Sequence, residues 1–300
     1  MRTRFPPDRK LTGRMLLTTF LLGLVYVAFA AALFALLKSI VVIVVVAAIL
    51  LGAQYFFSDR IALTGMRARI VSPEEQPRLH GVIDRLCASA NMPKPRVALA
   101  ETDLPNAFAT GRNTKRAVVC VTTGLLRRLD NAELEGVLAH ELSHIAHRDV
   151  AVMTVASFLG VLAGLVARFA FYTQMFGGGR RNGDQVAIMV LLITVVSVVV
   201  YAISFLLVRA LSRYRELAAD RSGAMLTGRP SALAAALTKV TGDMARIPTR
   251  DLRAAEAFNA FFFAPAVGSR LSALLSTHPS LEVRLTRLAE LSAGMGEPSA

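Results

Sequence analysis

The chain has 300 residues, 54% of which are hydrophobic, and 34 basic residues against 21 acidic ones give it a formal net charge of +13. An ordinary soluble domain is only ~45–50% apolar, so this composition excludes that class and indicates a membrane protein. The basic surplus shows neither the interleaving of basic and aromatic residues nor a fold that would indicate nucleic-acid binding. We therefore expect arginines beside the anionic lipid of a bilayer, and no nucleic-acid partner.

Four apolar runs account for the hydrophobic surplus: residues 15–37, 40–57, 150 to about 176, and 186–208. A helix that spans hydrocarbon needs ~20 apolar residues, a length that the first and fourth runs reach easily and the second only just. The third run contains Arg168, which an isolated helix would not place at the middle of a bilayer. If this helix enters the membrane at Val150, Arg168 reaches the far interface. Whether the third and fourth runs span the membrane or only dip into it stays open.

The first two runs predict a transmembrane hairpin over residues 15–57. The first run is too long for a signal peptide, and the second follows after only Lys38 and Ser39. Basic residues lie before and after this hairpin, which predicts that both of its ends are cytoplasmic. Arg180 and Arg181, between the third and fourth runs, argue mildly for the opposite orientation of that pair.

The residues after the first hairpin predict helices and a small sheet. Ser72 followed by Pro73 predicts the start of a helix that runs to Ala90, and we expect His80 on its polar, solvent-facing side. Three short runs with strand character, each bounded by Pro, Gly or Asn, predict a sheet of about three strands. They are residues 96–100, 106–110 and 117–121.

The stretch from Asp130 to Glu133 is a capping-box signature, which predicts a helix that runs to about His147. The chain has two cysteines, Cys87 and Cys120. Both fall in the part predicted to be cytoplasmic, so we expect reduced, buried thiols.

The predicted helix from Asp130 carries an HExxH motif at residues 140–144. Side chains four positions apart share a helix face, so His140 and His144 can bind one metal ion, and Glu141 lies close enough to reach a water on that ion. Apolar neighbours on both sides predict that the histidines are buried, which is costly for two imidazoles without a partner. The motif therefore predicts a zinc ion.

A zinc hydrolase needs three protein ligands, a general base and one open coordination position. Glu216 and Asp220 lie beyond the last apolar run and are also four positions apart. We assign Glu216 as the third ligand and Asp220 as the carboxylate that orients a ligand histidine.

Two stretches of chain predict where the metal lies relative to the membrane. Seven residues separate His144 from Ala151, or roughly 10 Å at the helical rise, and eight separate Val208 from Glu216, or roughly 12 Å. If the two helices enter and leave the membrane at one surface, the histidines and the glutamate therefore lie at about the same distance from that surface. We expect the zinc within about two helical turns of the bilayer, whether the hairpin spans or dips.

With residues 212–220 added, the chain resembles the HtpX-type integral-membrane zinc metallopeptidases, which are relatives of the CAAX prenyl proteases. The resemblance extends from about residue 70 to residue 288 and includes the membrane layout. Beside the HExxH motif and the residues around Glu216, it rests on four ordered motifs at Asn106–Arg112, Thr122–Leu126, His147–Asp149 and Thr277–Pro279.

The resemblance implies one Zn²⁺ per chain, with ligands His140, His144 and Glu216 and a catalytic Glu141. It implies an active site that faces the cytoplasm from the bacterial cytoplasmic (inner) membrane. It also implies a quality-control role, in which damaged or misassembled membrane proteins are cut.

Three further motifs have a plain structural interpretation beside a functional one. His278 precedes a helix that carries Arg284, and the turn is either a surface cap or, by resemblance to the family's His-Pro element, a donor to the developing oxyanion with Arg284 supporting it. Asn106 and Ala107 belong either to an ordinary edge strand or to one that pairs with the substrate backbone. His147 lies one turn too far along the helix to be a fourth ligand, so we expect it to support the site or the helix end, with Arg148 and Asp149 marking the membrane entrance.

The sequence thus predicts an α+β, mainly α-helical, membrane-anchored endopeptidase with a small sheet beside the HExxH helix. Zinc would activate water and polarise the scissile carbonyl, Glu141 would act as general base and then acid, and Asp220 and His278 would act as assigned above. Two alternatives are an inactive membrane scaffold with a structural zinc and a CAAX-type processing enzyme, whose chamber needs about seven spans. The predicted divisions are residues 1–14 (basic terminus), 15–57 (transmembrane hairpin), 58–149 (first catalytic part), 150–208 (second apolar hairpin) and 209–300 (second catalytic part).

Overall fold

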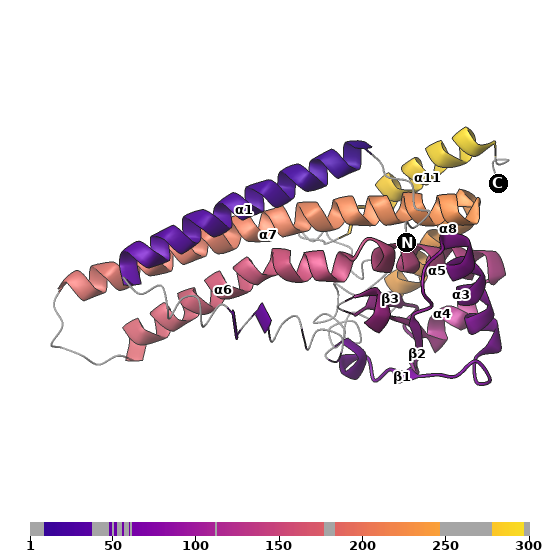
Figure 1. The fold of residues 1–300 in the computed structure, drawn as a ribbon, viewed down its shortest axis with the longest axis horizontal. Helices are drawn as coiled ribbons and strands as arrows, with labels where there is room; N and C mark the ends of the chain where they lie inside the picture. Colours follow the sequence, from indigo (N-terminus) through magenta and orange to yellow (C-terminus); the bar gives the residue numbers. More distant parts are fainter. Residues whose placement is uncertain are drawn as a thin grey trace. The chain divides into compact units, whose positions relative to one another are not determined.

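The computed structural model of the chain describes residues 9–37, 62–111, 113–176, 184–246 and 278–296, with isolated positions between 48 and 60. The described residues are mainly helical with one small sheet, which confirms the predicted fold class (Figure 1). The helices are α1 (Arg9–Leu37), α3 (Pro77–Ala90), α4 (Thr123–Arg128), α5 (Asn131–Ala146), α6 (Asp149–Phe176), α7 (Asp184–Thr227), α8 (Pro230–Arg246) and α11 (Leu281–Met295).

The chain forms two compact units, each of which is discontinuous in sequence. One contains Met1–Thr12, Phe57–Ala151 and Ser212–Ala300, and the other contains Gly13–Phe56 and Val152–Leu211. The first unit holds the sheet and the HExxH helix, whereas the second holds most of α1, α6 and the first part of α7.

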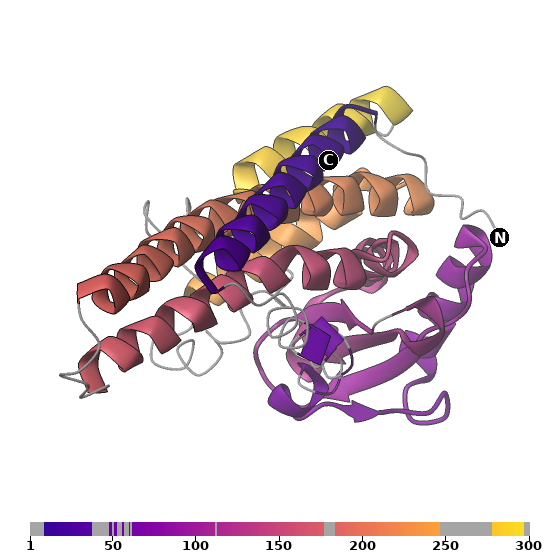
Figure 2. The same cartoon turned by 60° about the vertical axis from the view of Figure 1, so that its left-hand side comes forward.

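The sheet of the first unit has four strands in the order β1-β2-β4-β3. Figure 2 shows the strands lying together in one layer. Strands β2 (Arg96–Ala100) and β4 (Val118–Thr122) are parallel, while β1 (Arg69–Ile70) and β3 (Ala107–Thr110) pair antiparallel at the two edges. The expected number of strands, three, was too low by one because β1 has only two residues, too few to show an alternating pattern.

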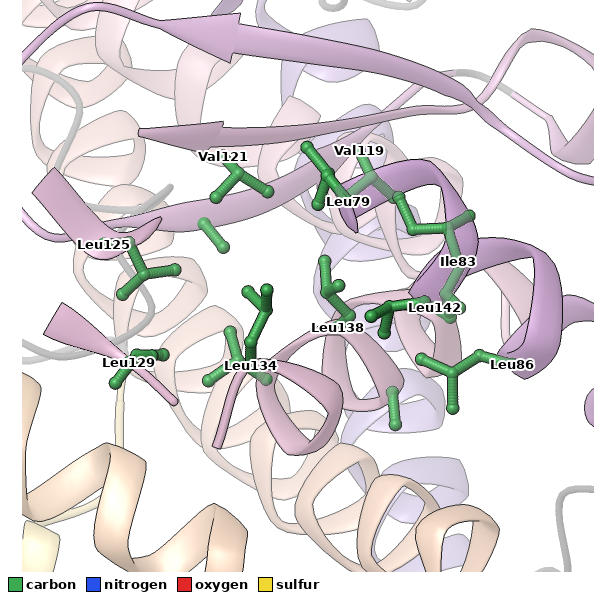
Figure 3. Packing of buried hydrophobic residues seen from close by; sticks show 14 of the residues in the cluster. Leu79, Ile83, Leu86, Val119, Val121, Leu125, Leu129, Leu134, Leu138 and Leu142 are labelled. Atoms are coloured by element: carbon green, nitrogen blue, oxygen red, sulfur yellow. The ribbon is translucent and has the colours of Figure 1, made fainter. Parts of the chain in front are cut away.

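Both faces of the sheet are covered, which explains why the central strands are apolar throughout rather than alternating. On one face, Ala98, Phe108 and Cys120 pack with Ala62 and Leu63. The other face packs against helices and forms the larger core. Figure 3 shows Leu138 and Leu142 of α5 pointing between side chains of α3, such as Ile83, and the strand residues Val119 and Val121. Each leucine buried in this way stabilises the fold by ~1.5–3 kcal/mol.

Helix α5 lies at the centre of this core and begins at the predicted capping box. The Asp130 side chain accepts a hydrogen bond from the Glu133 N–H, and the Glu133 side chain accepts one from the Asp130 N–H, both at 2.9 Å. Glu133 also pairs with Lys239 of α8 at 2.7 Å. A Cβ on Gly136 would lie 3.2 Å from the backbone of Leu233, so a residue without a side chain lets α5 and α8 pack closely.

Two details of α3 differ from the sequence-based expectation. The helix starts at Pro77 rather than near residue 73, because Ser72 and Glu75 close a separate turn in which the Ser72 N–H donates to the Glu75 carboxylate at 2.9 Å. His80 was expected in solvent but is buried, with Nε2 3.1 Å from the Val71 carbonyl. The predicted end at Ala90 is confirmed, since Asn91 adopts the left-handed conformation at the C-terminus of the helix.

The second unit contains apolar helices, and Figure 1 and Figure 2 both show α1, α6 and α7 running alongside one another. The Tyr26 hydroxyl of α1 donates to the Val155 carbonyl of α6 at 2.5 Å. Three of the described helices are long and apolar enough to cross a membrane: Arg9–Ala35, Asp149–Arg168 and Ala187–Thr227. Apart from isolated positions, the predicted second apolar run (residues 40–57) lies outside the described residues, as do Arg180 and Arg181.

Both cysteines are buried free thiols, as predicted. Burial raises the pKa of Cys87 to about 11 and that of Cys120 to about 12. Because the thiolate is the reactive form, we expect neither cysteine to react with a maleimide even near pH 9, where an ordinary thiol of pKa ~8.5 is mostly ionised. Mass spectrometry should find no adduct on the native protein and two after unfolding. Rapid labelling of either native thiol would contradict this packing.

Candidate metal centre

The two histidines of the HExxH motif face each other on one side of α5. His140 is almost fully buried and His144 slightly less so. Their ring centroids are 4.8 Å apart with the rings edge to face, and their Nε2 atoms are 3.2 Å apart. The four-residue spacing on a helix therefore brings the two Nε2 atoms together, as the sequence predicted.

The Glu216 carboxylate, on α7, completes a set of three donors. Its Oε2 lies 3.6 Å from His140 Nε2, and its Oε1 lies 3.4 Å from His144 Nε2. Metal–ligand bonds of ~2.0–2.1 Å at tetrahedral angles separate the ligand atoms by roughly 3.3 Å. The measured separations fit a zinc ion bound by these three side chains, which among the described residues form the one such group of His, Cys, Asp and Glu donors.

Asp220, one helical turn after Glu216, contacts the far side of the His140 ring. Its Oδ1 lies 3.0 Å from His140 Nδ1. Arg284 of α11 holds the same carboxylate through two hydrogen bonds, from Nε to Oδ2 at 2.8 Å and from Nη2 to Oδ1 at 2.6 Å. Asp220 therefore lies beside His140, where the sequence placed it, and Arg284 contacts Asp220 while its Nη1 lies 3.8 Å from Glu216 Oε2.

A close approach between α5 and α7 allows these contacts. A Cβ on Gly223 of α7 would lie 2.8 Å from the backbone nitrogen of His140 and 3.0 Å from its Cα. Real Cβ atoms essentially never come that close to backbone atoms, so glycine is required for this separation. Gly223 was not identified from the sequence, although it lies only three residues after Asp220 on α7.

Glu141 lies beside the donors and under the edge strand β3. Its carboxylate is buried and accepts a hydrogen bond from the backbone of Ala109. Burial raises the pKa of Glu141 above the ordinary glutamate value. A carboxylate with a raised pKa near the site is the kind of group that general acid–base catalysis uses.

The two predicted substrate-binding residues differ in their backbone contacts. The Asn106 N–H donates to the Thr122 Oγ1 at 2.9 Å, and its carbonyl accepts from the Thr122 N–H at 3.0 Å. Along an antiparallel pair the hydrogen-bonding direction alternates from one residue to the next. The backbone groups of Ala107 therefore point away from β4, towards the outer edge of the sheet.

His278 lies next to the donor set, just before α11. Its Nδ1 is 3.0 Å from Glu216 Oε2, and the side chain is buried. The interpretation of this turn as a surface cap is therefore wrong for the histidine itself, although Ser280 does cap α11 by accepting from the Val283 N–H.

One carboxylate near the site was not assigned to it from the sequence. Asp149 Oδ2 lies 2.6 Å from His144 Nδ1, whereas Asp149 was expected to mark the membrane entrance. Helical periodicity does not indicate this contact, because a residue five positions after His144 would not share its face.

His147 ends α5, and burial among other causes lowers its pKa to about 4.

The charges around the histidines favour a cation. At His140 burial, together with His144, lowers the imidazole pKa, but the hydrogen bonds with Asp220 and Glu216 and the charge of Asp220 outweigh these effects and raise it. At His144 burial acts in the same direction and is outweighed chiefly by Glu216. Metal ions compete with protons for such donors, so a cluster that favours positive charge on its imidazoles fits a bound zinc ion.

Comparison with known proteins supports this chemistry. Residues 73–292 match peptidase family M48. The chain is 67% identical to "Protease HtpX homolog 1" of Streptomyces coelicolor over 302 residues, covering 100% of this chain and 99% of that protein. It is 53% identical to "Protease HtpX homolog" of Moorella thermoacetica over 299 residues, covering 99% of each.

A solved structure also has a similar fold. The crystal structure of S. mikatae Ste24p matches with a TM-score of 0.52 and 18% sequence identity, covering 94% of this chain and 66% of that chain. At this identity the likeness shows the fold alone, and the chain spans about two thirds of that protein's length.

The approach of α7 to His140 gives a testable prediction. Replacing Gly223 by alanine forces the helices apart, which should lower the free energy of unfolding by about 1–3 kcal/mol and reduce the zinc bound per chain. Gly242→Ala is a matched control, because nothing lies within 4 Å of a Cβ there, and alanine should stabilise helix α8 by about 0.5–1 kcal/mol. Thermal unfolding in detergent measures the stability of both variants. Equal midpoints for the two variants would refute the close contact.

Proposed function

Because this chain belongs to peptidase family M48 and is a membrane-associated metalloprotease, we propose that it is a zinc-dependent endopeptidase of the bacterial cytoplasmic membrane. The observation that carries the proposal is the convergence of His140, His144 and Glu216, whose ligand atoms all lie within 4.8 Å of one another. The three residues come from two helices that are far apart in sequence, so their meeting is not a by-product of one helix face.

In this proposal His140, His144 and Glu216 would hold one zinc ion. A zinc ion bound by them would supply Lewis acidity towards the scissile carbonyl and towards the attacking water. Glu141 takes the proton of the attacking water and passes it to the leaving amine. Its raised pKa suits both directions of transfer, because a carboxyl group with an ordinary pKa gives up its proton too readily to act as an acid near neutral pH.

Two further groups would support the reaction. The Arg284–Asp220 pair fixes the His140 ring through Nδ1, which keeps the Nε2 side turned to the donor set. His278 lies beside Glu216, which supports its proposed role as a hydrogen-bond donor to the oxyanion that develops on the substrate. Arg284 would act through Asp220, beside its proposed support of His278.

The substrate would bind as an added strand along β3. This strand is at the edge of the sheet in the order β1-β2-β4-β3, and it contacts Glu141 through Ala109. A peptide paired with the outward backbone groups of Ala107 would run past the general base. The Asn106 backbone already bonds to Thr122, so any contact of Asn106 with substrate would be through its side chain.

The membrane location fits substrates that are themselves membrane proteins. Helix α7 contains both the apolar run at residues 186–208 and Glu216, so the proposed third ligand lies on the same helix as a candidate membrane segment. Basic residues around the N-terminal hairpin favour a cytoplasmic active site by the positive-inside rule. We therefore propose that damaged or misassembled membrane proteins are cut at the cytoplasmic face.

The alternative of an inactive scaffold with a structural zinc is less well supported. Structural zinc sites are closed by four protein ligands, whereas the group found among the described residues has three. Glu141, which a scaffold would not need, is present and buried next to the donors.

The role of Glu141 is tested by Glu141→Gln. The variant should keep about one zinc per chain, because Glu141 is not a ligand, yet its cleavage of casein and of an unfolded membrane protein should fall by at least ~10²-fold. Glu135→Gln, six positions earlier on α5, is the control and should cleave normally. Zinc is counted by atomic emission, and cleavage sites are mapped by mass spectrometry. Normal turnover in Glu141→Gln would overturn the assignment, and inactive, zinc-loaded native protein would favour the scaffold.

Orientation has a test of its own. The proposed topology places the C-terminus in the cytoplasm, because α11 carries Arg284 of the site. A C-terminal epitope tag should survive external protease in intact spheroplasts and be digested in inverted membrane vesicles. Digestion in spheroplasts would contradict a cytoplasmic active site while leaving the metal chemistry untouched.

A further inference from the structure

The two histidines of the metal centre have matching surroundings. The Nε2 atom of each faces Glu216, and the Nδ1 atom of each faces an aspartate. For His140 the aspartate is Asp220, at 3.0 Å. For His144 it is Asp149, at 2.6 Å. Asp149 belongs neither to the HExxH motif nor to the Glu216–Asp220 pair; it ends the His147–Asp149 motif and precedes the apolar part of α6.

An aspartate at Nδ1 controls which ring nitrogen is available to a metal. Asp149 accepts the Nδ1 proton, so the unprotonated nitrogen of a neutral His144 ring is Nε2. That atom is 3.2 Å from His140 Nε2 and 3.4 Å from Glu216 Oε1. The contact with Asp149 therefore fixes both the tautomer and the direction of the ring.

A reversal of the chain brings Asp149 back to His144. Helix α5 ends at Ala146, and Arg148 adopts φ +58°, which is unusual for a residue other than glycine. Helix α6 then starts at Asp149. The Asp149 carboxylate lies in the first turn of that helix, where the helix dipole stabilises a negative charge.

Arg215 holds the Asp149 carboxylate in place. It forms an ion pair with Asp149, and its Nη2 also donates to the His147 carbonyl at 3.4 Å. Both charged side chains are buried. Because a buried carboxylate that loses its cationic partner is destabilised by several kcal/mol, Asp149 would turn away from its present position if Arg215 were removed. Arg215 directly precedes Glu216 on α7, so one stretch of helix supplies a ligand and an anchor.

We propose that Asp149 and Arg215 are positioning residues for the metal ligand His144, in the way that Asp220 and Arg284 serve His140. This inference rests on the proposed metal site. Loss of a hydrogen-bond partner behind a ligand histidine lowers metal affinity by about 10–100-fold. The same loss should follow at Asp149, and removal of Arg215 should act through it.

The test measures zinc affinity rather than peptide cleavage. Full-length protein carrying Glu141→Gln, which prevents self-digestion, is titrated in detergent against a chromophoric zinc chelator. Asp149→Ala should raise the zinc Kd by about 10–100-fold. Asp149→Asn keeps an oxygen acceptor for the Nδ1–H of His144, so it should lose less zinc affinity than Asp149→Ala. Arg215→Gln should weaken binding, and Arg215→Lys, which keeps the charge, should restore part of it.

A double-mutant cycle separates a shared role from two independent ones. If Arg215 acts through Asp149, the double variant Asp149→Ala, Arg215→Gln should bind zinc no more weakly than Asp149→Ala alone. The matched control is Asp243→Asn, which removes the 2.9 Å ion pair between Arg128 and Asp243 in the same unit and should leave the zinc Kd unchanged. Thermal unfolding of the metal-free proteins reports any general loss of stability.

The outcomes are distinguishable. If the parent protein with Glu141→Gln binds no zinc, the proposed metal site itself fails. If the parent binds zinc and both Asp149 variants keep its Kd within twofold, the positioning role of Asp149 is refuted. If the losses at Asp149 and Arg215 simply add, Arg215 does not act through Asp149. Should Asp149→Ala fail to fold, Asp149→Asn and Arg215→Lys still carry the test.

Discussion

The candidate site depends on the contact between Gly223 of α7 and the backbone of His140 in α5. At this separation, the Asp220 carboxylate reaches His140 Nδ1 and the Glu216 carboxylate reaches both Nε2 atoms. A side chain at the contact would separate the helices by more than the tolerance of a zinc site, whose bonds vary by only about 0.2 Å. Packing of the rest of α5 against the sheet and α8 holds one side of this contact fixed.

Charge compensation is the second constraint. The described part of the site buries several carboxylates close together, and each of the two aspartates behind the histidines is matched by its own arginine. Glu216, whose Oε2 also lies 3.8 Å from Arg284 Nη1, would face the cation together with the two imidazoles. Removing one partner of a buried pair costs about 3–5 kcal/mol, because the other charge remains in a medium of low polarity. The arginines are therefore as necessary to the geometry as the ligands, although neither touches the donor nitrogens.

Contacts that follow from helical periodicity or from a local sequence motif could be predicted from the sequence. The HExxH spacing, the four-residue step from Glu216 to Asp220 and the capping box at Asp130 are all local patterns, and the structure has each contact they imply. Contacts that depend on a turn or on packing could not be predicted. Asp149 reaches His144 only because Arg148 takes a left-handed conformation, and nothing local indicates that Arg284 bonds to Asp220.

The order of the site's parts along the chain has a consequence for biogenesis. The histidines precede α6 and α7, and Glu216 lies on α7 after the apolar run at residues 186–208. A ribosome therefore releases the first two ligands before the apolar segments and the third only after them. Two imidazoles alone would hold zinc weakly, so with the proposed ligands a nascent chain would carry an incomplete centre until α7 has been synthesised. A protease built in this order would not cut the polypeptides around it before its own synthesis has passed Glu216.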